Sequence, residues 1–252
     1  MSDGRAIFSH KAEAYARYRW SYAPAAIRVF CETAQLGSHS WVADLGAGTG
    51  ILTRQLARWV GRLSAVEPNP EMRRAATKAL AAFPTCEVLD ASAEDTNLPG
   101  QSVDAITAAQ AIHWFNPLPA RREFQRILKP GGWLGCFRNS STRPELEQAL
   151  EGLNIPENGV ARTPHGSPFG SQPPGFYFGG ETYQKQSFPF TFQQNWEGFF
   201  GALISTSFMP DEGHPCFSHL EAAARAVFDR FSAAGWLEVR GETELILGQP
   251  QY

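Results

Sequence analysis

The residue types best suited to chemistry gather in one segment, Val42 to Gly50, with the sequence VADLGAGTG. Gly46, Gly48 and Gly50 allow a tight turn and let a ligand approach the backbone without a Cβ in the way. The segment follows an apolar run and opens an amphipathic one, so it joins a strand to a helix. The N–H groups of such a turn and the helix N-terminus can receive a negatively charged group.

The spacing of these glycines distinguishes between ligands. A dinucleotide-binding turn has the pattern GxGxxG, whereas the third place of that pattern falls here on Ile51 and the spacing is GxGxG. Asp44 lies two residues before the first glycine, where its carboxylate would repel a pyrophosphate but could pair with an ammonium group. The turn therefore favours a nucleoside that carries an amino acid over NAD. A tight turn without any ligand is the alternative.

A second acid ends the next apolar run. Glu67, in the sequence VEPN, follows the glycine segment by about 17 residues, which suits one helix and one strand. An acid at the tip of the second strand of a Rossmann half can accept hydrogen bonds from both ribose hydroxyls. Alone, Glu67 could be a solvated surface residue. Together with Asp44 and the glycines, it indicates a nucleoside site.

Further motifs give the chain a family resemblance. SAE at Ser92 to Glu94, VD at Val103 and Asp104, and LKPGG at Leu128 to Gly132 complete a set that resembles class I S-adenosylmethionine-dependent methyltransferases of the type 11 family. Within it, the chain is similar to small-molecule enzymes such as ubiquinone-biosynthesis and trans-aconitate methyltransferases. The resemblance covers residues 8–138 and extends more loosely to 252. It implies S-adenosylmethionine as cofactor, S-adenosylhomocysteine as its product, and in-line methyl transfer to a small-molecule acceptor.

The resemblance also implies a role for each residue of the cofactor site. The glycine loop should hold the methionine part with Asp44 near its amino group, Glu67 should bind the ribose, and Gln110 should lie under the methionine moiety. Many relatives have an Asp where this chain has Ser92, so either the Ser92 hydroxyl or Asp90 is expected to replace it at the adenine. The expected cofactor-binding residues are Asp44, Gly46, Ala47, Gly48, Gly50, Glu67, Pro68, Asn69, Met72, Ser92, Ala93, Gln110, Tyr15 and Arg19.

The N-terminal contacts come from a helix with a mixed pattern. Tyr15, Tyr18, Arg19 and Tyr22 resemble the YxxYR element of the family, although Trp20 replaces the usual Pro after the Arg. In the family this helix folds over the cofactor, with Arg19 or a Tyr at its carboxylate. A solvated, partly amphipathic helix is the other interpretation.

The active-site face is expected at the sequence AQAIHWF, Ala109 to Phe115, because open α/β sheets bind ligands at the carboxyl ends of strands. His113 is the candidate catalytic residue, as a positioning residue or a general base, with a purely structural histidine as the third hypothesis. Transfer of a sulfonium methyl needs mainly positioning, and no catalytic triad, paired carboxylates or metal-binding motif is found. The expected substrate-pocket residues are Trp114, Tyr177, Trp196, Ser205 and Ser207.

The pattern of apolar residues predicts the elements that position these groups. Short apolar runs alternate with amphipathic stretches over residues 40–138, which predicts βα units and a parallel sheet. KPGG, Lys129 to Gly132, is expected as a turn that stops a helix, and residues 154–180 as a long loop. The expected strands are Trp41–Leu45, Leu63–Glu67, Glu87–Asp90, Val103–Ala109, Trp133–Arg138, Ser187–Phe192 and Val239–Leu247, the last two adding an antiparallel member.

These elements predict an α/β fold: a Rossmann-like, mostly parallel seven-stranded sheet with helices on both faces and an inserted aromatic-rich cap. We expect residues 1–38 to form a helical segment over the cofactor, 39–139 the cofactor-binding core, and 140–252 the substrate cap with the final strands.

The bulk composition limits the partners. A net charge of −3 over 252 residues, without a Lys/Arg run, argues against a nucleic-acid partner. No apolar run reaches the roughly 18 residues of a membrane span and no secretory signal is found, so we expect a cytoplasmic protein. Four dispersed cysteines predict reduced thiols. The alternatives are an NAD(P)-dependent oxidoreductase, a cofactor-binding protein without turnover, and an RNA or protein methyltransferase.

Overall fold

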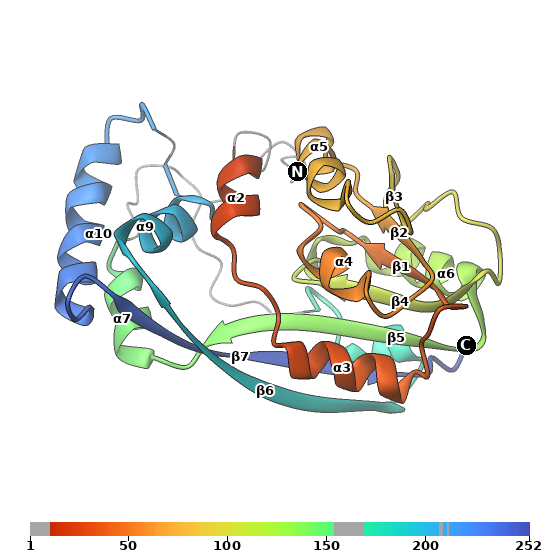
Figure 1. Cartoon of the computed structure of the whole chain (residues 1–252). Helices are drawn as coiled ribbons and strands as arrows, with labels where there is room; N and C mark the ends of the chain where they lie inside the picture. Colours follow the sequence, from red (N-terminus) through yellow and green to blue (C-terminus); the bar gives the residue numbers. More distant parts are fainter. Residues whose placement is uncertain (1–10, 154–168, 207–208, 211) are drawn as a thin grey trace.

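The computed structural model describes residues 11–153, 169–206, 209–210 and 212–252, which form a seven-stranded sheet in the order β3-β2-β1-β4-β5-β7-β6. The strands β1 to β5 run parallel, and β7 is antiparallel to both β5 and β6, so the sheet is mixed (Figure 1). The expected seven-stranded α/β sheet is confirmed. The strands are β1 (Trp41–Leu45), β2 (Arg62–Val66), β3 (Cys86–Leu89), β4 (Val103–Ala109), β5 (Leu128–Ser141), β6 (Tyr183–Gln194) and β7 (Leu237–Gly248).

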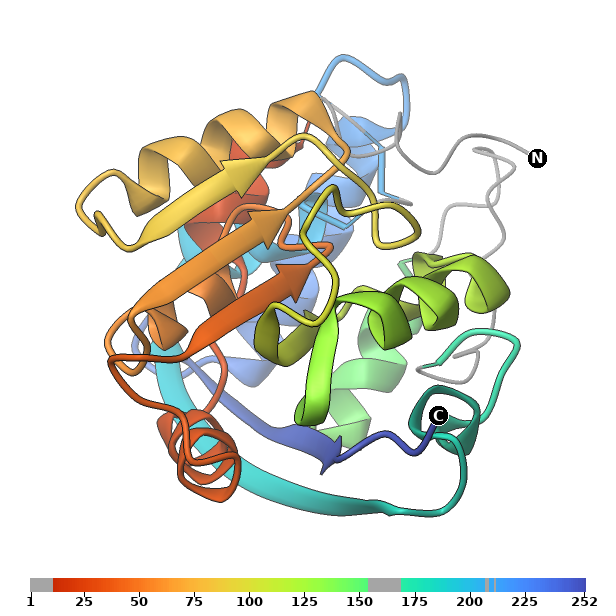
Figure 2. The same cartoon turned by 90° about the vertical axis from the view of Figure 1, so that its right-hand side faces the viewer.

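Helices cover both faces of the sheet, as expected. The described helices are α2 (Ala12–Tyr18), α3 (Pro24–Thr33), α4 (Ile51–Leu56), α5 (Pro70–Leu80), the 3-10 helix η1 (Ile112–Trp114), α6 (Pro117–Ile127), α7 (Pro144–Glu151), α8 (Pro174–Phe178), α9 (Trp196–Ile204) and α10 (Phe217–Phe231). One core packs α3 and α4 against the sheet, and a second packs α6 and α8 against the opposite face. Figure 2 shows α5 and α6 on opposite sides of the parallel strands. Because β1 and β4 are covered on both faces, most of their residues are buried, including the polar Asp44 and Thr107.

A third core forms a separate lobe, here called the α9–α10 lobe, from α7, α9, α10 and the far ends of β6 and β7 (Figure 1). The two long strands leave the sheet and continue into this lobe. Helix α2 lies between the lobe and α5, and it contacts both α9 and α5. The N-terminal segment therefore bridges the two parts of the molecule.

Two segments differ from the sequence-based expectation. The KPGG turn is instead the start of β5: Leu128 pairs with Val103 and Trp133 pairs with Ala105, so the ladder bulges between them. Gly131, with φ of 74°, allows this bulge. Within the stretch expected as a loop, residues 174–178 form α8, and residues 154–168 lie outside the described part of the chain.

The strand order reverses between β1 and β4, since β2 and β3 extend the sheet in one direction and β4 and β5 in the other. Such a switch point leaves a crevice at the carboxyl ends of the two central strands, where open α/β sheets bind ligands. No helix among the described residues has the length and apolar character needed to cross a bilayer.

Candidate functional site

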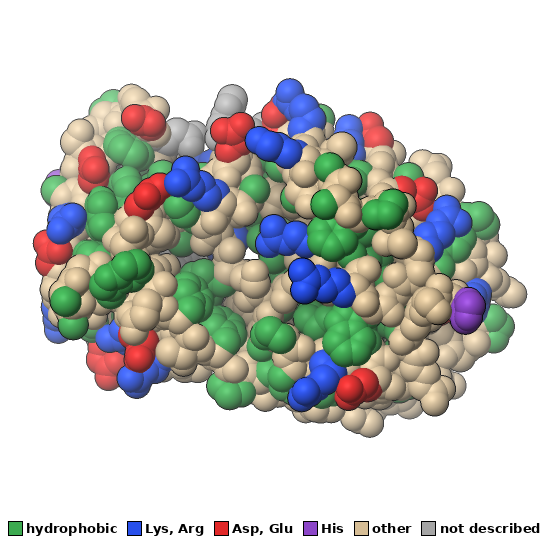
Figure 3. Space-filling model, in the orientation of Figure 1, with side chains coloured by type: hydrophobic (Ala, Val, Ile, Leu, Met, Phe, Trp, Pro, Cys, Tyr) green, Lys and Arg blue, Asp and Glu red, His purple; other side chains and the backbone are tan. Residues whose placement is uncertain are grey.

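A cavity of about 410 Å³ opens at this switch point, where β1, β2 and β4 end. The face shown in Figure 3 is hollowed below α2, between the sheet and the α9–α10 lobe. The cavity wall consists of Tyr15, Tyr22, Gly46, Ala47, Gly48, Thr49, Ile51, Leu52, Glu67, Pro68, Asn69, Met72, Ser92, Ala93, Glu94, Ala109, Gln110, Ala111, Trp114 and Phe115. Twelve of the residues expected from the sequence at the cofactor or substrate are therefore brought to one wall.

The glycine loop needs its glycines for two different reasons. Gly46 and Gly48 have φ values of 65° and 56°, in the left-handed region that favours glycine. A Cβ on Gly46 would also lie 2.7 Å from the Cβ of Ala111, whereas a Cβ on Gly48 would meet no atom within 4 Å. Gly46 is thus required for packing, and Gly48 faces open space in the cavity.

The amides of this loop are already used within the protein. The N–H groups of Gly46 and Ala47 donate to the carbonyl of Val66 at 2.9 and 3.1 Å, and the N–H of Gly48 donates to Oε2 of Glu67 at 2.8 Å. A pyrophosphate needs several unpaired amides at such a turn. This geometry disfavours a dinucleotide and agrees with the GxGxG spacing.

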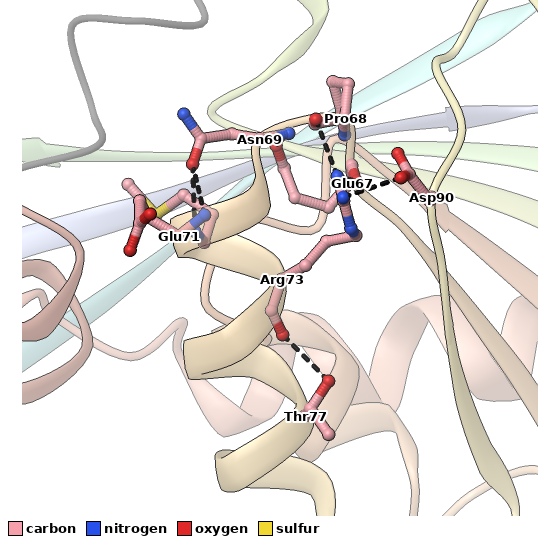
Figure 4. Close-up of polar contacts among 8 residues, drawn as sticks. Glu67, Pro68, Asn69, Glu71, Arg73, Thr77 and Asp90 are labelled. Carbon is pink, nitrogen blue, oxygen red and sulfur yellow. Dashed lines mark hydrogen bonds and ion pairs between the residues drawn. The ribbon is translucent and has the colours of Figure 1, made fainter.

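Glu67 is fixed at the wall by two backbone amides. Its Oε2 accepts from Gly48, and its Oε1 accepts from the N–H of Asn69 at 2.8 Å. The Asn69 side chain in turn caps α5 by accepting from the amides of Glu71 and Met72 at 2.9 and 3.0 Å (Figure 4). Both carboxylate oxygens are therefore held in place by backbone N–H groups at the end of β2.

Arg73 braces the strand end from the outer side. Its guanidinium donates to the carbonyls of Glu67 and Pro68 at 3.0 and 2.7 Å and pairs with Asp90 at 2.7 Å (Figure 4). Asp90, one of the two candidates for the adenine contact, is engaged in this ion pair and lies off the cavity wall, whereas Ser92 lies on it.

Asp44 lies beneath the loop instead of on the cavity wall. It is 1% exposed, and its carboxylate accepts from the hydroxyls of Thr53 at 2.6 Å and Thr107 at 2.9 Å. Burial raises the pKa of Asp44 to about 6, and the charge of Glu67 adds to this, while the two threonine hydrogen bonds oppose it. Asp44 therefore ties β1 to α4 and β4.

The N-terminal helix α2 and the segment that follows it each bring one tyrosine to the cavity. Tyr15 and Tyr22 lie on the wall, and the Arg19 guanidinium lies 4.9 Å from the centre of the Tyr15 ring. Two buried atoms, Nε of Arg19 and Oγ1 of Thr49, have no hydrogen-bond partner among the described residues. Arg19 is not part of the wall, whereas Thr49 is.

Gln110 occupies a strained position at the end of β4. Its φ of 53° lies in the left-handed region, which few residues other than glycine adopt. Its N–H donates to the carbonyl of Phe137 at 2.9 Å, and its side-chain Nε2 donates to the carbonyl of Asn139 at 3.1 Å. The side-chain oxygen is therefore the atom free to accept a hydrogen bond, and strain of this kind is typical of functional sites.

His113 lies beside the cavity and not on its wall. Its ring is 5.0 Å from that of Trp114, which lies at the cavity rim with 51% of its surface exposed. Partial desolvation, and then the positive charge of Arg138, lower the pKa of His113, so the neutral imidazole prevails at neutral pH.

Four of the other expected residues are placed elsewhere. Tyr177 is fully buried in the core between Phe124 and Phe169, with both ring centroids at 6.0 Å. Trp196 stacks on Phe200 in the α9–α10 lobe at 4.9 Å. Ser205 is buried and donates to the carbonyl of Ala202 at 2.7 Å, while Gly50 packs against Leu80 behind the loop. Ser207 lies outside the described residues.

The wall also contains residues outside the expected cofactor- and substrate-binding sets, although Ala109, Ala111 and Phe115 belong to the expected active-site face. They are Tyr22, Thr49, Ile51, Leu52, Glu94, Ala109, Ala111 and Phe115. Most follow directly on residues of the recognised motifs, and that adjacency is the signal that could have found them. Among the described residues, no group of His, Cys, Asp and Glu side chains is arranged to hold a metal ion.

Known proteins with a similar sequence are methyltransferases. Residues 43–136 match the family described as Methyltransferase domain. An uncharacterized methyltransferase of Mycobacterium tuberculosis is 41% identical over 133 residues, covering 53% of this chain and 52% of that protein. A malonyl-[acyl-carrier protein] O-methyltransferase of a Marinomonas species is 30% identical over 123 residues, covering 46% of this chain and 45% of that protein. The chain thus spans about half the length of these curated relatives.

Solved structures have a similar fold. A candidate type II methyltransferase from Anaeromyxobacter dehalogenans has a TM-score of 0.63 and 22% identity, over 92% of this chain and 98% of its own. The YcgJ protein of Bacillus subtilis has a TM-score of 0.53 and 19% identity, over 91% of this chain and 100% of its own. At these identities the likeness establishes the fold alone.

Proposed function

Because residues 43–136 form a methyltransferase domain of the type 11 family, which belongs to the class I S-adenosylmethionine-dependent enzymes, we propose that this chain transfers a methyl group from S-adenosylmethionine to a small-molecule acceptor by in-line displacement. The observation that carries the proposal is the shared wall: the glycine loop and Glu67 face one cavity, at the point where the strand order reverses.

The residues present fit this cofactor. Glu67 offers carboxylate lone pairs to a ribose diol, and Met72, Trp114 and Phe115 supply apolar surface for a flat base. Two of the buried atoms without a partner among the described residues, Oγ1 of Thr49 and Nε of Arg19, are donors that suit an amino-acid carboxylate. The side-chain oxygen of Gln110 suits an ammonium group. The site thus offers complementary groups to both ends of an amino-acid nucleoside.

We assign Pro68, Asn69, Ser92 and Ala93 to the adenine and ribose end, and Tyr15 and the loop Gly46–Gly50 to the methionine end. Asp44 is assigned a supporting part, since its oxygens are held by Thr53 and Thr107 below the loop. Residues 1–38, 39–139 and 140–252 are proposed as the covering segment, the binding core and the part that holds the acceptor.

When bound, the cofactor supplies a methyl group already activated on a sulfonium. The protein then has to orient the acceptor and exclude water, which can contribute several kcal/mol by positioning alone. Tyr15 and Tyr22 close the cavity from the α2 side, and Trp114 lies at its rim. We assign His113, which lies beside the cavity and whose pKa is lowered, to positioning the acceptor or to taking a proton from an acidic acceptor.

A small acceptor is favoured over RNA by the net charge of −3. Tyr15 of α2 and Tyr22 of the following segment close one side of the cavity, which favours a compact acceptor over a folded protein. The Marinomonas relative is named for a malonyl group on a carrier protein, so a small acid on a carrier is the second candidate acceptor.

Thermal unfolding with added S-adenosylmethionine or S-adenosylhomocysteine tests the proposal. We expect both compounds to raise the melting temperature, and Gly48→Val to remove the increase, because the valine would be strained at φ of 56° and would enter the cavity. Gly37→Val, in open space before β1, is the matched control. An increase with NAD(P)H alone would support an oxidoreductase instead, and cofactor binding without turnover against a broad acceptor panel would support a binding protein.

A further inference from the structure

Residues 20–23, here called the strap, connect α2 to α3 and pass along one side of the cavity. Of these four residues, Tyr22 alone lies on the cavity wall. Its ring is 6% exposed and packs edge-on against Phe137 at 5.9 Å. The path of the strap backbone therefore determines where the buried Tyr22 side chain lies at the cavity wall.

Side chains from the sheet and α4 hold the strap by its backbone. Gln55 makes a two-way contact with Tyr22, accepting from its N–H at 3.0 Å and donating to its carbonyl at 2.8 Å. The N–H of Ala23 donates to Oγ1 of Thr243 at 2.8 Å. Nδ2 of Asn139 lies 3.4 and 3.2 Å from the carbonyls of Trp20 and Ser21.

The direction of each hydrogen bond in this network is determined. The carbonyls of the strap can only accept, so Nδ2 of Asn139 faces them, and its Oδ1 accepts at 2.6 Å from the Thr243 hydroxyl, whose oxygen accepts from Ala23. The bond from Thr243 holds the Asn139 amide in this orientation. Thr243 and Asn139 lie opposite each other on β7 and β5, and Thr243 is fully buried. A valine at position 243 would have the same shape but could make neither bond.

Asn139 also forms a hydrogen bond with Gln110, the residue with a left-handed backbone on the cavity wall. The backbone carbonyl of Asn139 accepts from Nε2 of Gln110 at 3.1 Å. The side-chain oxygen of Gln110 therefore points away from Asn139. Asn139 thus contacts Gln110 directly, and it contacts the strap next to Tyr22 through the carbonyls of Trp20 and Ser21. A shift of Asn139 would move both of them.

We infer that Thr243 is a positioning residue for the cofactor site: through Asn139 it sets the strap, and through the strap it sets the Tyr22 hydroxyl that contacts the bound nucleoside. Thr243 itself does not touch the cavity. The inference rests on the proposed function and adds to it a determinant on the last strand, far in sequence from every binding motif.

Binding of S-adenosylhomocysteine by purified variants tests the inference. Thr243→Val is expected to weaken affinity about tenfold, because two buried hydrogen bonds are lost. Thr243→Ser keeps the hydroxyl and removes a buried methyl, so we expect a lower melting temperature with affinity within about twofold of the original. Thr191→Val, on the exposed face of β6, is the control for a threonine-to-valine change on a strand.

A double-mutant cycle separates positioning from general loss of structure. Tyr22→Phe is expected to weaken affinity about fivefold alone, but less than about twofold in the Thr243→Val background, because the phenol is then already displaced. Asn139→Asp, which still accepts from Thr243 but cannot donate to the strap, should behave as Thr243→Val does and serves if the valine variant does not fold.

The outcomes are distinct. Independent effects of Tyr22→Phe and Thr243→Val, or unchanged affinity in Thr243→Val and Asn139→Asp, would overturn the inference and leave the proposed function intact. Failure of the unaltered chain to bind S-adenosylhomocysteine would overturn both.

Discussion

The amide of Gly48 donates to Oε2 of Glu67 at 2.8 Å, although 19 positions separate the two residues. The bond joins the turn after β1 to the end of β2, so the two cofactor motifs form one unit. We expect Glu67→Gln to weaken S-adenosylhomocysteine binding at least about tenfold, because an amide nitrogen would then oppose one of the two backbone donors. Calorimetric titration measures this. Glu71→Gln, in the first turn of α5, is the control, and equal affinity in both variants would contradict the assignment.

Gly46 and Gly48 offer a matched pair for stability. Gly48→Ala introduces a left-handed alanine in open space, which costs about 1–2 kcal/mol of strain. Gly46→Ala adds the same strain and also a contact of 2.7 Å with Ala111. The free energy of unfolding in urea should therefore fall further for Gly46→Ala. Unfolding of the two variants at the same urea concentration would show that the contact with Ala111 does not lower stability.

Stability should depend on pH through Asp44. Its pKa is raised to about 6 in the folded protein, above the value of about 4 in an unfolded chain. The folded state therefore binds the extra proton between these values, and the contribution of Asp44 to stability falls as pH rises from 4 to 6. Asp44→Asn keeps hydrogen-bonding groups for Thr53 and Thr107 but does not titrate.

We expect the free energy of unfolding of the original chain, relative to Asp44→Asn, to decrease by about 2 kcal/mol between pH 4 and pH 7. Urea unfolding of both proteins across this range measures the difference. A difference that stays constant, or that increases with pH, would rule out a raised pKa at this site.

Lys11, at the start of α2, connects this helix to the α9–α10 lobe. It is 6% exposed, and its ammonium group donates to the carbonyl of Thr206 at 2.8 Å and to that of Met209, beyond the end of α9. Lys11→Met should loosen α2, so amide hydrogen exchange over residues 12–18 should accelerate. Lys78→Met, on the exposed side of α5, should leave it unchanged. Equal exchange in both variants would show that α2 is held by its other contacts.

The parts of the fold set by short-range patterns could be predicted. The apolar run of β4 gave both of its ends, Val103 and Ala109, and that of β1 gave Trp41 and Leu45. The start of β5 could not be predicted, because Lys129 to Gly132 have the composition of a turn. Only the neighbouring strand β4, with its pairing of Leu128 to Val103, keeps them in the sheet.

In the site too, residues placed by short-range patterns could be predicted, and residues placed by contacts between distant segments could not. Gly48, Glu67 and Gln110 lie at strand ends, whose common edge follows from parallel topology, so their motifs sufficed. Tyr177 and Trp196 were chosen for aromatic composition, which does not distinguish a pocket from a core. The role inferred for Thr243 depends on β7 pairing beside β5, a contact that no local pattern contains.

The link between Ala23 and Thr243 spans 220 positions, nearly the whole polypeptide. During translation, α2, the strap and all of the parallel strands are therefore synthesised before Thr243, the residue that binds the strap. Contacts of such sequence separation form late, because a long chain must be closed on itself first. The nascent protein should thus acquire its ligand affinity in one final step, when β7 inserts between β5 and β6.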